Sequence, residues 1–514
     1  MPIRLVTAQE MRALDRAAIE KFGIPSFTLM QRAATGAADI LRRTFSRDER
    51  RRILVVAGKG NNGGDGMVCA RLLARSGSAI RVALMASPRE LKGDAARAFE
   101  ELGGTRVGVA TDVGIRELGQ MLTEATLVVD ALLGTGLNTP VTGRFAEAIC
   151  AMNGSGKPIF SLDVPSGLDA DRGIPLGVAV CAAATVTFGL AKLGLFVYPG
   201  RAFSGKLHVV DIGIPEPALG EISSKAWALE ATDVARRLPV RPPTAHKGNC
   251  GHVLVVGGAL GRTGAAKMAA EAALRAGAGL VTLAGPATVQ HVSAAHLPEI
   301  MTVGLPDTGG ALRFDERALS TALEGKNAVV VGPGMGTSED CERIVKWFLE
   351  RPGLPIVCDA DALTCLSRAS EWASLKRAQV VVTPHPGEFS RLTGHPVAEV
   401  QGNRPALARE FATRHTCTLV LKGASTVVAE ENGTLWVNPT GNPGMAAGGM
   451  GDVLAGLIGG FLAQGLRPVD AAIVSVFIHG ASADALSREY AAVGFLATEV
   501  AREVPRQLHA LRGR

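Results

Sequence analysis

Two glycine-rich turns, each ending on an aspartate, contain the residues of this sequence best suited to chemistry. The first is Gly58-Lys-Gly-Asn-Asn-Gly-Gly-Asp65, and the second runs from Gly441 to Asp452 and closes with Gly-Gly-Met-Gly-Asp. Glycine lets backbone N–H groups approach an anion closely, and such turns commonly lead into a helix N-terminus that favours phosphate. An aspartate at such a position can serve as a base. The two turns therefore predict two separate sites for phosphate-bearing ligands.

The elements around the turns indicate an α/β fold in two domains. Short β-branched runs alternate with helical stretches, and the expected strands are 53–57, 80–85, 127–129, 159–162 and 186–188, then 253–256, 280–283, 328–331, 356–358, 380–382 and 419–421. Apolar strands alternating with helices predict mostly parallel sheets covered on both faces. Proline-rich segments near 214–224 and 238–244 lack an apolar period. They indicate a boundary near 220–240, so we expect domains at 1–222 and 223–514.

The N-terminal segment predicts a capped helix. Thr7 and Glu10 form a Thr-x-x-Glu capping box ahead of apolar residues at helical spacing. These apolar residues are Met11, Leu14, Ala18 and Phe22. The helix should therefore begin after Thr7 and pack that stripe against the first domain.

Composition bounds the class of protein. The 514 residues are 47% hydrophobic and 20% charged with a net charge of +6, which is typical of a globular protein of two or three domains. Two tyrosines, four tryptophans and no basic stripe argue against nucleic-acid binding. Eight scattered cysteines without metal spacing indicate buried free thiols in a reducing compartment. No signal-peptide pattern is visible, and apolar runs such as 453–463 are too short to cross a bilayer. We expect a cytoplasmic homo-oligomer that binds neither nucleic acid nor membrane.

Three strand ends in the first half supply groups for a single site. Gly58-x-Gly60-x-x-Gly63 follows a strand, as in dinucleotide-binding turns, but the next strand ends without the acidic residue that a dehydrogenase uses for ribose. A tight strand-to-helix turn without a ligand remains an alternative. Asp130, Asp163 and Ser166 follow two further strands, and such ends converge at one edge of a parallel sheet. Asn62, Asp130 and Ser166 can then offer oxygen ligands to a cation, which leaves Asp163 as an acid or base.

The second half contains no Gly-x-x-x-x-Gly-Lys-Ser/Thr motif, which excludes a Walker-type nucleotide site. Gly448-Gly-Met-Gly-Asp452 instead opens a helical stretch, so its N–H groups would face a transferring phosphoryl group with Asp452 as base. His385 and Glu388 follow a strand and can contact a substrate or organise Mg²⁺ through water, although a capped loop with a solvated glutamate is an equal alternative. The loop after Leu421 can hold a nucleotide phosphate or ribose. A plain glycine-rich linker at 441–452 is the remaining alternative.

The first half resembles NAD(P)H-hydrate epimerase over about residues 8–215. The resemblance is carried by Gly-x-Gly-Asn-Asn-Gly-Gly-Asp-Gly at 58–66, Val-Asp-Ala-Leu-Leu-Gly-Thr-Gly at 129–136 and Leu-Asp-Val-Pro-Ser-Gly at 162–167. It implies a Rossmann-like three-layer sandwich, K⁺ held by Asn62, Asp130 and Ser166, and substrate contact by Asp163. It also implies that the hydrated nucleotide is bound by Asn61, Asn62, Gly63, Gly64, Asp65, Gly134, Thr135, Gly136, Leu137, Asn138, Thr139 and Pro140. Gln31 stands where that family often has a glutamate.

The second half resembles the ribokinase-like ADP/ATP-dependent NAD(P)H-hydrate dehydratase over about residues 230–505. The matching segments are 246–248, 263–265, 332–336, 359–363, 383–388 and 441–444. The resemblance implies a second three-layer sandwich with a mostly parallel sheet. It implies that Ala265, Gly334, His385 and Asp452 contact the hydrate, and that the adenine nucleotide is bound by Lys422, Gly423, Ala424, Ser425, Thr426 and Gly451.

These resemblances predict a bifunctional enzyme that repairs hydrated NADH and NADPH. The first domain would interconvert the R and S epimers, with Asp163 as acid and base. The second would dehydrate the S form with ADP or ATP and Mg²⁺, with Asp452 as base. The leading alternative is a ribokinase-type kinase of a hydroxymethylpyrimidine or sugar with a regulatory or scaffold N-terminal domain. A non-catalytic N-terminal binding module and a dehydrogenase are weaker alternatives.

Overall fold

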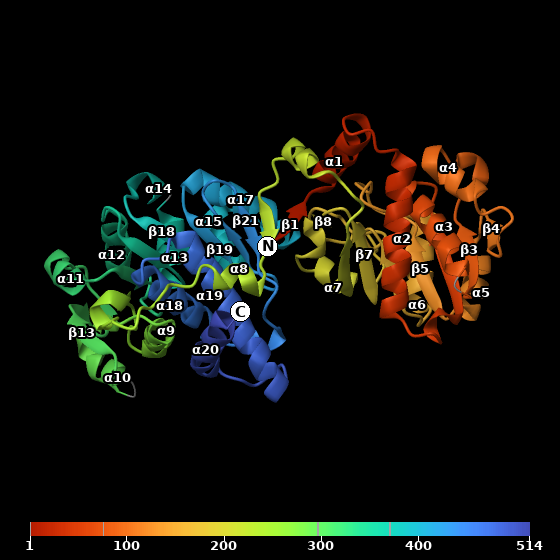
Figure 1. The fold of residues 1–514 in the computed structure, drawn as a ribbon. Helices are drawn as coiled ribbons and strands as arrows, with labels where there is room; N and C mark the ends of the chain where they lie inside the picture. The colour runs from red at the N-terminus through yellow and green to blue at the C-terminus, as the bar shows by residue number, and fades with distance from the viewer. Residues whose placement is uncertain (1, 76, 296–297, 370–371, 514) are drawn as a thin grey trace. The chain divides into compact units, whose positions relative to one another are not determined.

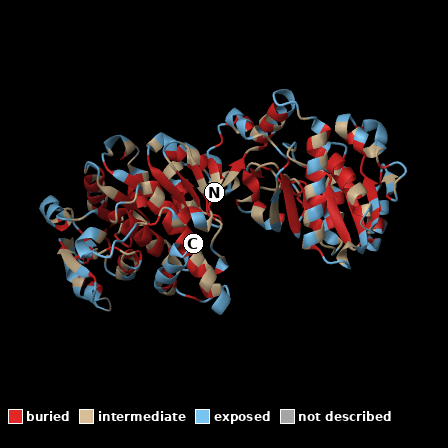
Figure 2. Cartoon of the chain, viewed as in Figure 1, coloured by how far each residue is buried: buried red, intermediate tan, exposed pale blue. Residues whose placement is uncertain are grey.

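The structure is a computed structural model that describes residues 2–75, 77–295, 298–369 and 372–513. The chain forms two compact units: Arg4–Ala226 is one, and Trp227–Arg514 together with the residues before Arg4 is the other. The chain passes from the first to the second within strand β10 (Ala226–Ala228). Each unit has its own sheet and its own buried core (Figures 1 and 2).

The N-terminal unit contains a seven-stranded sheet in the order β4-β3-β2-β5-β6-β7-β9, in which every neighbouring pair is parallel. Its strands are β2 (Arg52–Ala57), β3 (Ala79–Leu84), β4 (Gly108–Thr111), β5 (Leu127–Ala131), β6 (Ile159–Leu162), β7 (Ala184–Phe188) and β9 (Lys206–Val210). Its longer helices are α1 (Ala8–Glu20), α2 (Ser26–Thr44), α3 (Asn61–Ala74), α4 (Gly93–Glu100), α5 (Ile115–Glu124) and α6 (Gly143–Gly154). A short parallel pair, β1 (Ile3–Val6) and β8 (Ala191–Lys192), places Lys192 beside Val6.

Strand β2 shows why this sheet has helices on both faces. Ile53, Val55 and Ala57 belong to the core cluster that includes α2 and α3. Leu54 and Val56 belong to the cluster that includes α5 and α6. Because side chains alternate between the faces of a strand, a continuous apolar run requires cover on both. The result is the three-layer arrangement that the sequence predicts.

The C-terminal unit contains a larger sheet in the order β13-β12-β11-β16-β17-β18-β19-β20-β21. The pairs from β13 to β19 are parallel, and β20 and β21 are added antiparallel. The strands are β11 (His252–Val256), β12 (Leu280–Pro286), β13 (Met301–Leu305), β16 (Ala328–Val331), β17 (Pro355–Cys358), β18 (Gln379–Val382), β19 (Thr418–Leu421), β20 (Val427–Ala429) and β21 (Leu435–Val437). The longer helices are α9 (Thr263–Arg275), α11 (Glu316–Leu323), α12 (Glu339–Leu349), α13 (Asp361–Arg368), α15 (Pro386–Thr393), α17 (Arg404–His415), α18 (Met450–Ala463), α19 (Pro468–Glu489) and α20 (Ala497–Arg512).

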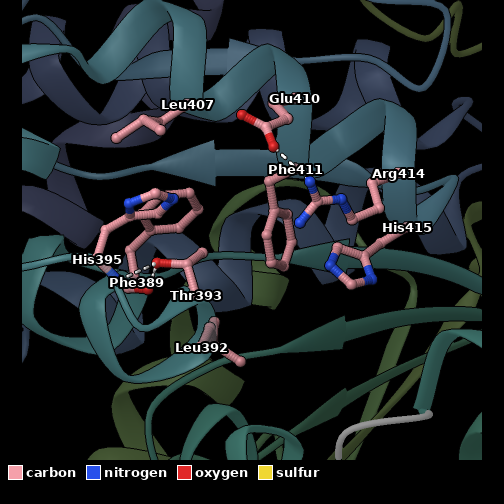
Figure 3. A pocket seen from close by; sticks show the side chains of 9 residues that line it. All are labelled: Phe389, Leu392, Thr393, His395, Leu407, Glu410, Phe411, Arg414 and His415. Carbon is pink, nitrogen blue, oxygen red and sulfur yellow. Dashed lines mark hydrogen bonds and ion pairs between the residues drawn. The ribbon is translucent and has the colours of Figure 1, made fainter.

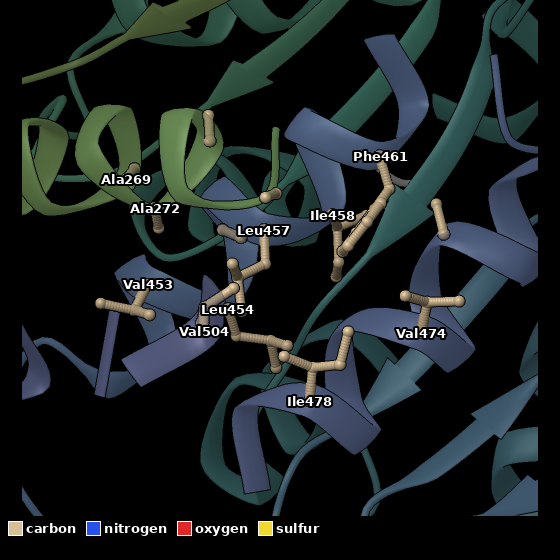
Figure 4. Close-up of a cluster of buried hydrophobic side chains, with 14 of the residues drawn as sticks. Ala269, Ala272, Val453, Leu454, Leu457, Ile458, Phe461, Val474, Ile478 and Val504 are labelled. Atoms are coloured by element: carbon tan, nitrogen blue, oxygen red, sulfur yellow. The ribbon is translucent and has the colours of Figure 1, made fainter. Parts of the chain in front are cut away.

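The main core of this unit lies where α9, α18, α19 and α20 pack together. Figure 4 shows Ala269 and Ala272 of α9 beside Leu457 of α18, with Ile478 and Val504 from α19 and α20. Small residues allow the α9–α18 pair to approach closely: a Cβ on Gly456 would lie 2.0 Å from the carbonyl oxygen of Ala269. Backbone contact of this kind fixes α18, and α18 carries Asp452.

One expectation about membranes needs correction. Helix α19 is long and apolar enough by length and composition to cross a bilayer, which the sequence reading had not anticipated. However, 78% of its apolar window is buried inside the structure, as expected for a core helix.

The local predictions were largely accurate. Each expected strand lies within a structural strand or differs from one by a residue, and the capping box at Thr7 and Glu10 is formed. Phe22 was wrongly placed on α1, because the helix ends at Glu20 and Phe22 is 40% exposed. Strands β20 and β21 were not anticipated, because they are short and follow the glycine-containing loop 422–426.

Candidate active sites

A cavity of about 590 Å³ in the N-terminal unit opens at the carboxyl ends of β2, β5 and β6. Of the residues implied by resemblance it is lined by Asn61, Asn62, Asp65, Gly134, Thr135, Gly136, Leu137, Asn138, Thr139 and Asp163. Parallel strands bring these loops together, as the sequence predicts. The cations Arg12 and Lys59 also line the cavity and can face a dinucleotide's phosphates.

Gly63, Gly64 and Pro140 do not line this cavity. A Cβ on Gly63 would lie 1.9 Å from the carbonyl oxygen of Gly58, and one on Gly64 would lie 2.6 Å from the methyl carbon of Met30. Both glycines therefore serve the tight packing of the turn against its own backbone and against α2. Within this one loop, Gly63 and Gly64 fit the alternative of a tight strand-to-helix turn, whereas Asn61, Asn62 and Asp65 line the cavity.

Asp163 forms a buried ion pair that the sequence reading missed. Its Oδ1 lies 2.7 Å from Nζ of Lys192, which also donates to the carbonyl oxygen of Phe188 at 2.8 Å. The Lys192 side chain is 1% exposed and that of Asp163 is 14% exposed. Asp163 also adopts a left-handed backbone conformation with φ of 62°, a strained position of the kind often found at functional sites. A lone lysine within the apolar run 188–197 was the available signal.

Three further carboxyl groups, those of Asp15, Asp65 and Asp94, line the same cavity, and the pKa values of Asp15 and Asp65 are raised. Burial raises the pKa of Asp65 well above its usual range, and the charges of Asp163 and Asp15 raise it further. Burial raises the pKa of Asp15 to about 6, with Lys192 opposing the shift and Asp163 adding to it. The cavity therefore holds carboxyl groups whose environments separate their protonation states, a pattern that suits acid–base chemistry.

The predicted cation ligands lie together around the backbone of Leu133. Asn62 Nδ2 donates to the Leu133 carbonyl oxygen at 2.9 Å, and Ser166 Oγ accepts from the Leu133 N–H at 2.8 Å. Ser166 Oγ also donates to Asp130 Oδ1 at 2.5 Å, and its N–H donates to Oδ2 at 2.9 Å. Burial raises the pKa of Asp130, while the hydrogen bonds from Ser166 and Ser161 oppose the shift. Asn62 Oδ1 is buried without a hydrogen-bond partner among the described residues.

In the C-terminal unit, Asp452 lies in the first turn of α18, after Gly449, whose φ is 91°. The first N–H groups of a helix have no partner within the helix and attract anions. Burial raises the pKa of Asp452 to about 7; Asp359 raises it further and Lys422 opposes the shift. A carboxyl group that titrates near neutrality at a helix N-terminus suits a base for phosphoryl transfer.

Lys422 and Asp359 form the second buried ion pair, with 2.7 Å between Nζ and Oδ1. Thr383 Oγ1 donates to the same oxygen at 2.7 Å, and Glu388 Oε2 lies 3.7 Å from the lysine Nζ. Burial disfavours the charged form of Lys422, but Asp359 and Glu388 outweigh this effect and raise its pKa. A Cβ on Gly451 would lie 3.2 Å from Lys422 Nζ, which places the ion pair beside the start of α18. Asp359 opens the matching segment 359–363 and directly follows the buried strand β17, but the sequence did not suggest a role for it.

His385 and Glu388 serve both as a cap and as part of this cluster. His385 caps α15: its Nδ1 accepts the Gly387 N–H at 3.0 Å, and Glu388 Oε2 accepts the His385 N–H at 2.8 Å. The helix cap expected under the capped-loop alternative is therefore present. Glu388, however, is buried, whereas that alternative expected a solvated glutamate. The His385 side chain is 53% exposed, and its other ring nitrogen, Nε2, lies 3.6 Å from Glu388 Oε2.

The remaining predicted residues fall into two groups: Ala265 with Gly334, and the loop 422–426. A Cβ on Gly334 would lie 3.3 Å from Cβ of Ala265, so these two lie together. The Lys422 N–H donates to the Pro384 carbonyl at 2.9 Å, which joins loop 422–426 to the His385 segment. Buried Arg404, also missed, supports that loop by donating to the Ala424 and Leu421 carbonyls at 2.6 and 3.0 Å. Ser425 Oγ is buried without a partner among the described residues.

Another cavity, of about 300 Å³, lies between α15 and α17 (Figure 3). It is lined by Phe389 and Phe411, with the Glu410–Arg414 ion pair of 2.5 Å at its edge. None of the predicted site residues lines it.

The fold and the two sites define a two-domain α/β enzyme of nucleotide chemistry. The family model "NAD(P)H-hydrate dehydratase" matches residues 253–506, and "YjeF-related protein N-terminus" matches residues 26–194. A bifunctional NAD(P)H-hydrate repair enzyme Nnr from Moorella thermoacetica is 42% identical over 94% of this chain and 93% of its own. The chain belongs to the family of bifunctional NAD(P)H-hydrate repair enzymes.

Solved structures resemble the C-terminal unit. A ribokinase-like superfamily protein from Enterococcus faecalis is 30% identical with a TM-score of 0.50, covering 57% of this chain and 99% of its own. An ADP/ATP-dependent NAD(P)H-hydrate dehydratase from Bacillus subtilis, co-crystallised with ATP and Mg²⁺, is 32% identical with a TM-score of 0.48, covering 55% and 97%. The first of these confirms the ribokinase-like fold.

Proposed function

We propose that this protein repairs hydrated NADH and NADPH at two sites. Residues 1–222 interconvert the R and S epimers, and residues 223–514 dehydrate the S form with ADP or ATP. Family membership supports both activities. The observation that carries the proposal is that each unit brings a cavity or cluster at its strand ends together with a carboxylate, Asp163 in one and Asp452 in the other.

Epimerisation uses the ring nitrogen of the substrate. The hydrate carries its hydroxyl on a carbon next to that nitrogen, whose lone pair expels the hydroxyl as it takes a proton and leaves as water. The planar iminium then accepts water on either face and gives up a proton to a carboxylate. Asp163 lines the cavity and pairs with the buried Lys192 ammonium group, so its carboxylate suits the step that deprotonates the incoming water.

We assign K⁺ to Asn62, Asp130 and Ser166. The residues fit such an ion, because Asn62 Oδ1 is a buried oxygen without a hydrogen-bond partner among the described residues, and Asn62 and Ser166 both hydrogen-bond to the Leu133 backbone. Asp130 supplies carboxyl oxygens in the same cluster. A bound cation would supply fixed positive charge beneath loop 134–140 and hold that loop's backbone in place.

Dehydration in the second unit proceeds through a phosphorylated intermediate. Asp452 removes the proton of the ring hydroxyl, whose oxygen attacks the terminal phosphoryl group of ADP or ATP; AMP or ADP leaves. The N–H groups at the start of α18 stabilise the charge on the transferring group. Phosphate is a better leaving group than hydroxide, so the ring nitrogen expels it, and proton loss from the adjacent carbon restores the dihydronicotinamide.

We assign Mg²⁺ to Asp359 and Glu388. Mg²⁺ in phosphoryl-transfer sites commonly uses one or two carboxylates together with substrate phosphates. Asp359 Oδ1 accepts from Lys422 and Thr383, whereas Oδ2 lies 3.7 Å from the position of a Cβ on Gly451 and so faces the phosphate turn. The ion would neutralise charge on the transferring phosphates, and Lys422–Thr426 would hold the nucleotide.

The test uses acid-hydrated NADH, which contains both epimers, with the full chain, KCl, MgCl₂ and ADP or ATP. Regained nicotinamide absorbance and phosphate release should reach completion with both epimers consumed. The substitution Asp163→Ala should slow consumption of the R epimer by about 100-fold or more and leave that of the S epimer unchanged. Replacing K⁺ with tetramethylammonium should also slow only the R epimer.

Two results would count against this function. If Asp163→Ala, correctly folded, stops consumption of both epimers, the division of labour between the units is wrong. If a stable phosphorylated product accumulates without recovery of reduced nicotinamide, the ribokinase-type kinase is the better description.

A further inference from the structure

One face of helix α1 lines the epimerase cavity. Met11, Asp15 and Ile19 are spaced four residues apart and therefore lie on the same side of the helix, and all three line the cavity. Asp15 is half-buried, and the apolar residues Met11 and Ile19 lie one helical turn before and after it. Placing a carboxyl group in such surroundings costs free energy. Asp15 takes no part in capping the helix, so capping does not explain its position.

Asp15 and Asp163 reach the cavity from different elements and in different states. Asp163, in the loop after β6, is locked to Lys192. No described residue donates a hydrogen bond to the Asp15 carboxyl or forms an ion pair with it. The groups that face Asp15 are Lys192 and Asp163, which shift its pKa in opposite directions. Asp65, Asp94, Arg12 and Lys59 are the other charged residues that line the cavity.

We propose that Asp15 is the second acid–base residue of the epimerase, acting on the ring face opposite to that served by Asp163. The inference rests on the proposed function. Inversion at the hydroxylated carbon requires the hydroxyl to leave from one face and water to enter on the other. A single fixed carboxylate reaches one face, so an acid and a base from two elements are needed.

The proton balance follows directly. Asp15, protonated, gives its proton to the leaving hydroxyl as the C–O bond breaks and the ring nitrogen forms the C=N bond. Water then bonds to the other face as its proton passes to the Asp163 carboxylate. The products are the epimer, one water exchanged with solvent, and the two carboxyls with their protonation states reversed. The reverse reaction starts from that state, and proton exchange with solvent restores the forward state.

The environment of Asp15 suits this role. Its pKa of about 6 leaves both forms accessible near neutral pH, with burial as the main cause. A carboxyl in water would be almost fully ionised there and would make a poor acid.

The experiment compares Asp15→Asn with wild type in the full chain, following each epimer separately. We expect both directions of epimerisation to fall by about 100-fold or more. ADP-dependent dehydration of the S epimer should be unchanged, since that site lies in the other unit. The substitution Asp39→Asn on α2, an exposed aspartate paired with Arg42, is the matched control and should change neither rate.

The pH profile separates a chemical role from a structural one. In wild type, kcat/KM for the direction in which Asp15 acts as the acid should fall as pH rises through about 6, because Asp15 must be protonated. We call this fall the limb. Asp15→Asn should lose that limb, and Asp15→Glu should keep it, shifted, with partial activity. If Asp15→Asn does not fold, the position of the limb in Asp15→Glu decides the matter.

Two outcomes overturn the inference in distinguishable ways. A folded Asp15→Asn variant that epimerises at a rate near wild type, or an Asp15→Glu limb at the wild-type pH, refutes the role of Asp15 and leaves the proposed function intact. A wild-type chain that never consumes the R epimer refutes the epimerase function itself, and this inference with it.

Discussion

Replacing Asp452 by asparagine should have opposite effects on activity and on stability. The substitution keeps the size of the side chain but removes the carboxylate that we propose as the base. General acid–base catalysis typically contributes about 10² to 10⁴ in rate, so dehydration of the S epimer at about pH 8 should fall by that factor. This corresponds to about 3–5 kcal/mol of transition-state stabilisation.

The pKa of about 7 for Asp452 sets the wild-type pH profile. The base must be ionised, so about one tenth of the enzyme is active one unit below the pKa and about nine tenths one unit above it. The wild-type kcat/KM for dehydration should therefore rise roughly tenfold between about pH 6 and about pH 8. The Asp452→Asn variant should lose this rise.

The same pKa shift predicts that the Asp452→Asn variant is more stable than wild type. The folded pKa of Asp452 lies about 3 units above the ordinary value of 3.8, because the folded state disfavours the charged form. The cost of ionising it is absent below about pH 4, grows as pH rises from 3.8 to 7 and stays constant above. Asparagine avoids that cost, so the free energy of unfolding should rise by up to about 4 kcal/mol at about pH 8 and not at about pH 4.

The assays are single-turnover recovery of nicotinamide absorbance and denaturant unfolding at the two pH values. Asp452→Asn with a wild-type rate and the wild-type pH rise would refute Asp452 as the base. A variant less stable than wild type at about pH 8 would refute the sign of the electrostatic argument.

Two further substitutions test the buried elements around the sites. Lys192→Met should destabilise the N-terminal unit by about 3–5 kcal/mol, because it leaves the largely buried Asp163 without its lysine partner. Lys21→Met, which removes an exposed ion pair, should change stability by under about 1 kcal/mol. Denaturant unfolding measures both changes, and equal losses of stability in the two variants would contradict a greater contribution from the buried ion pair. Gly456→Ala should destabilise the C-terminal unit by about 1–3 kcal/mol, since its Cβ would lie 2.0 Å from the Ala269 carbonyl oxygen. Gly264→Ala, whose Cβ would meet nothing within 4 Å, should be neutral or stabilising, and thermal unfolding that fails to separate the two would refute the close approach of α9 and α18.

The amino-acid sequence alone determined the order of strands and helices and the loops that carry function. Continuous apolar runs with helices between them predict parallel sheets covered on both faces, and parallel sheets collect the strand-end loops at one edge. For that reason Asn62, Asp130, Asp163 and Ser166 could be expected near one another before any coordinates were known. Motifs such as those at 58–66 and 441–444 also indicated the family, which the comparisons confirm.

The tertiary structure alone decided which charges meet and how they titrate. Lys192 stands 29 residues after Asp163, and Lys422 stands 63 residues after Asp359, yet each pair is 2.7 Å apart. No local pattern encodes such pairs, because contact between residues far apart in sequence depends on how whole strands and helices pack. The same holds for Asp15, whose position on a capped helix is readable from sequence, while its place in the cavity and its pKa depend on burial by other elements.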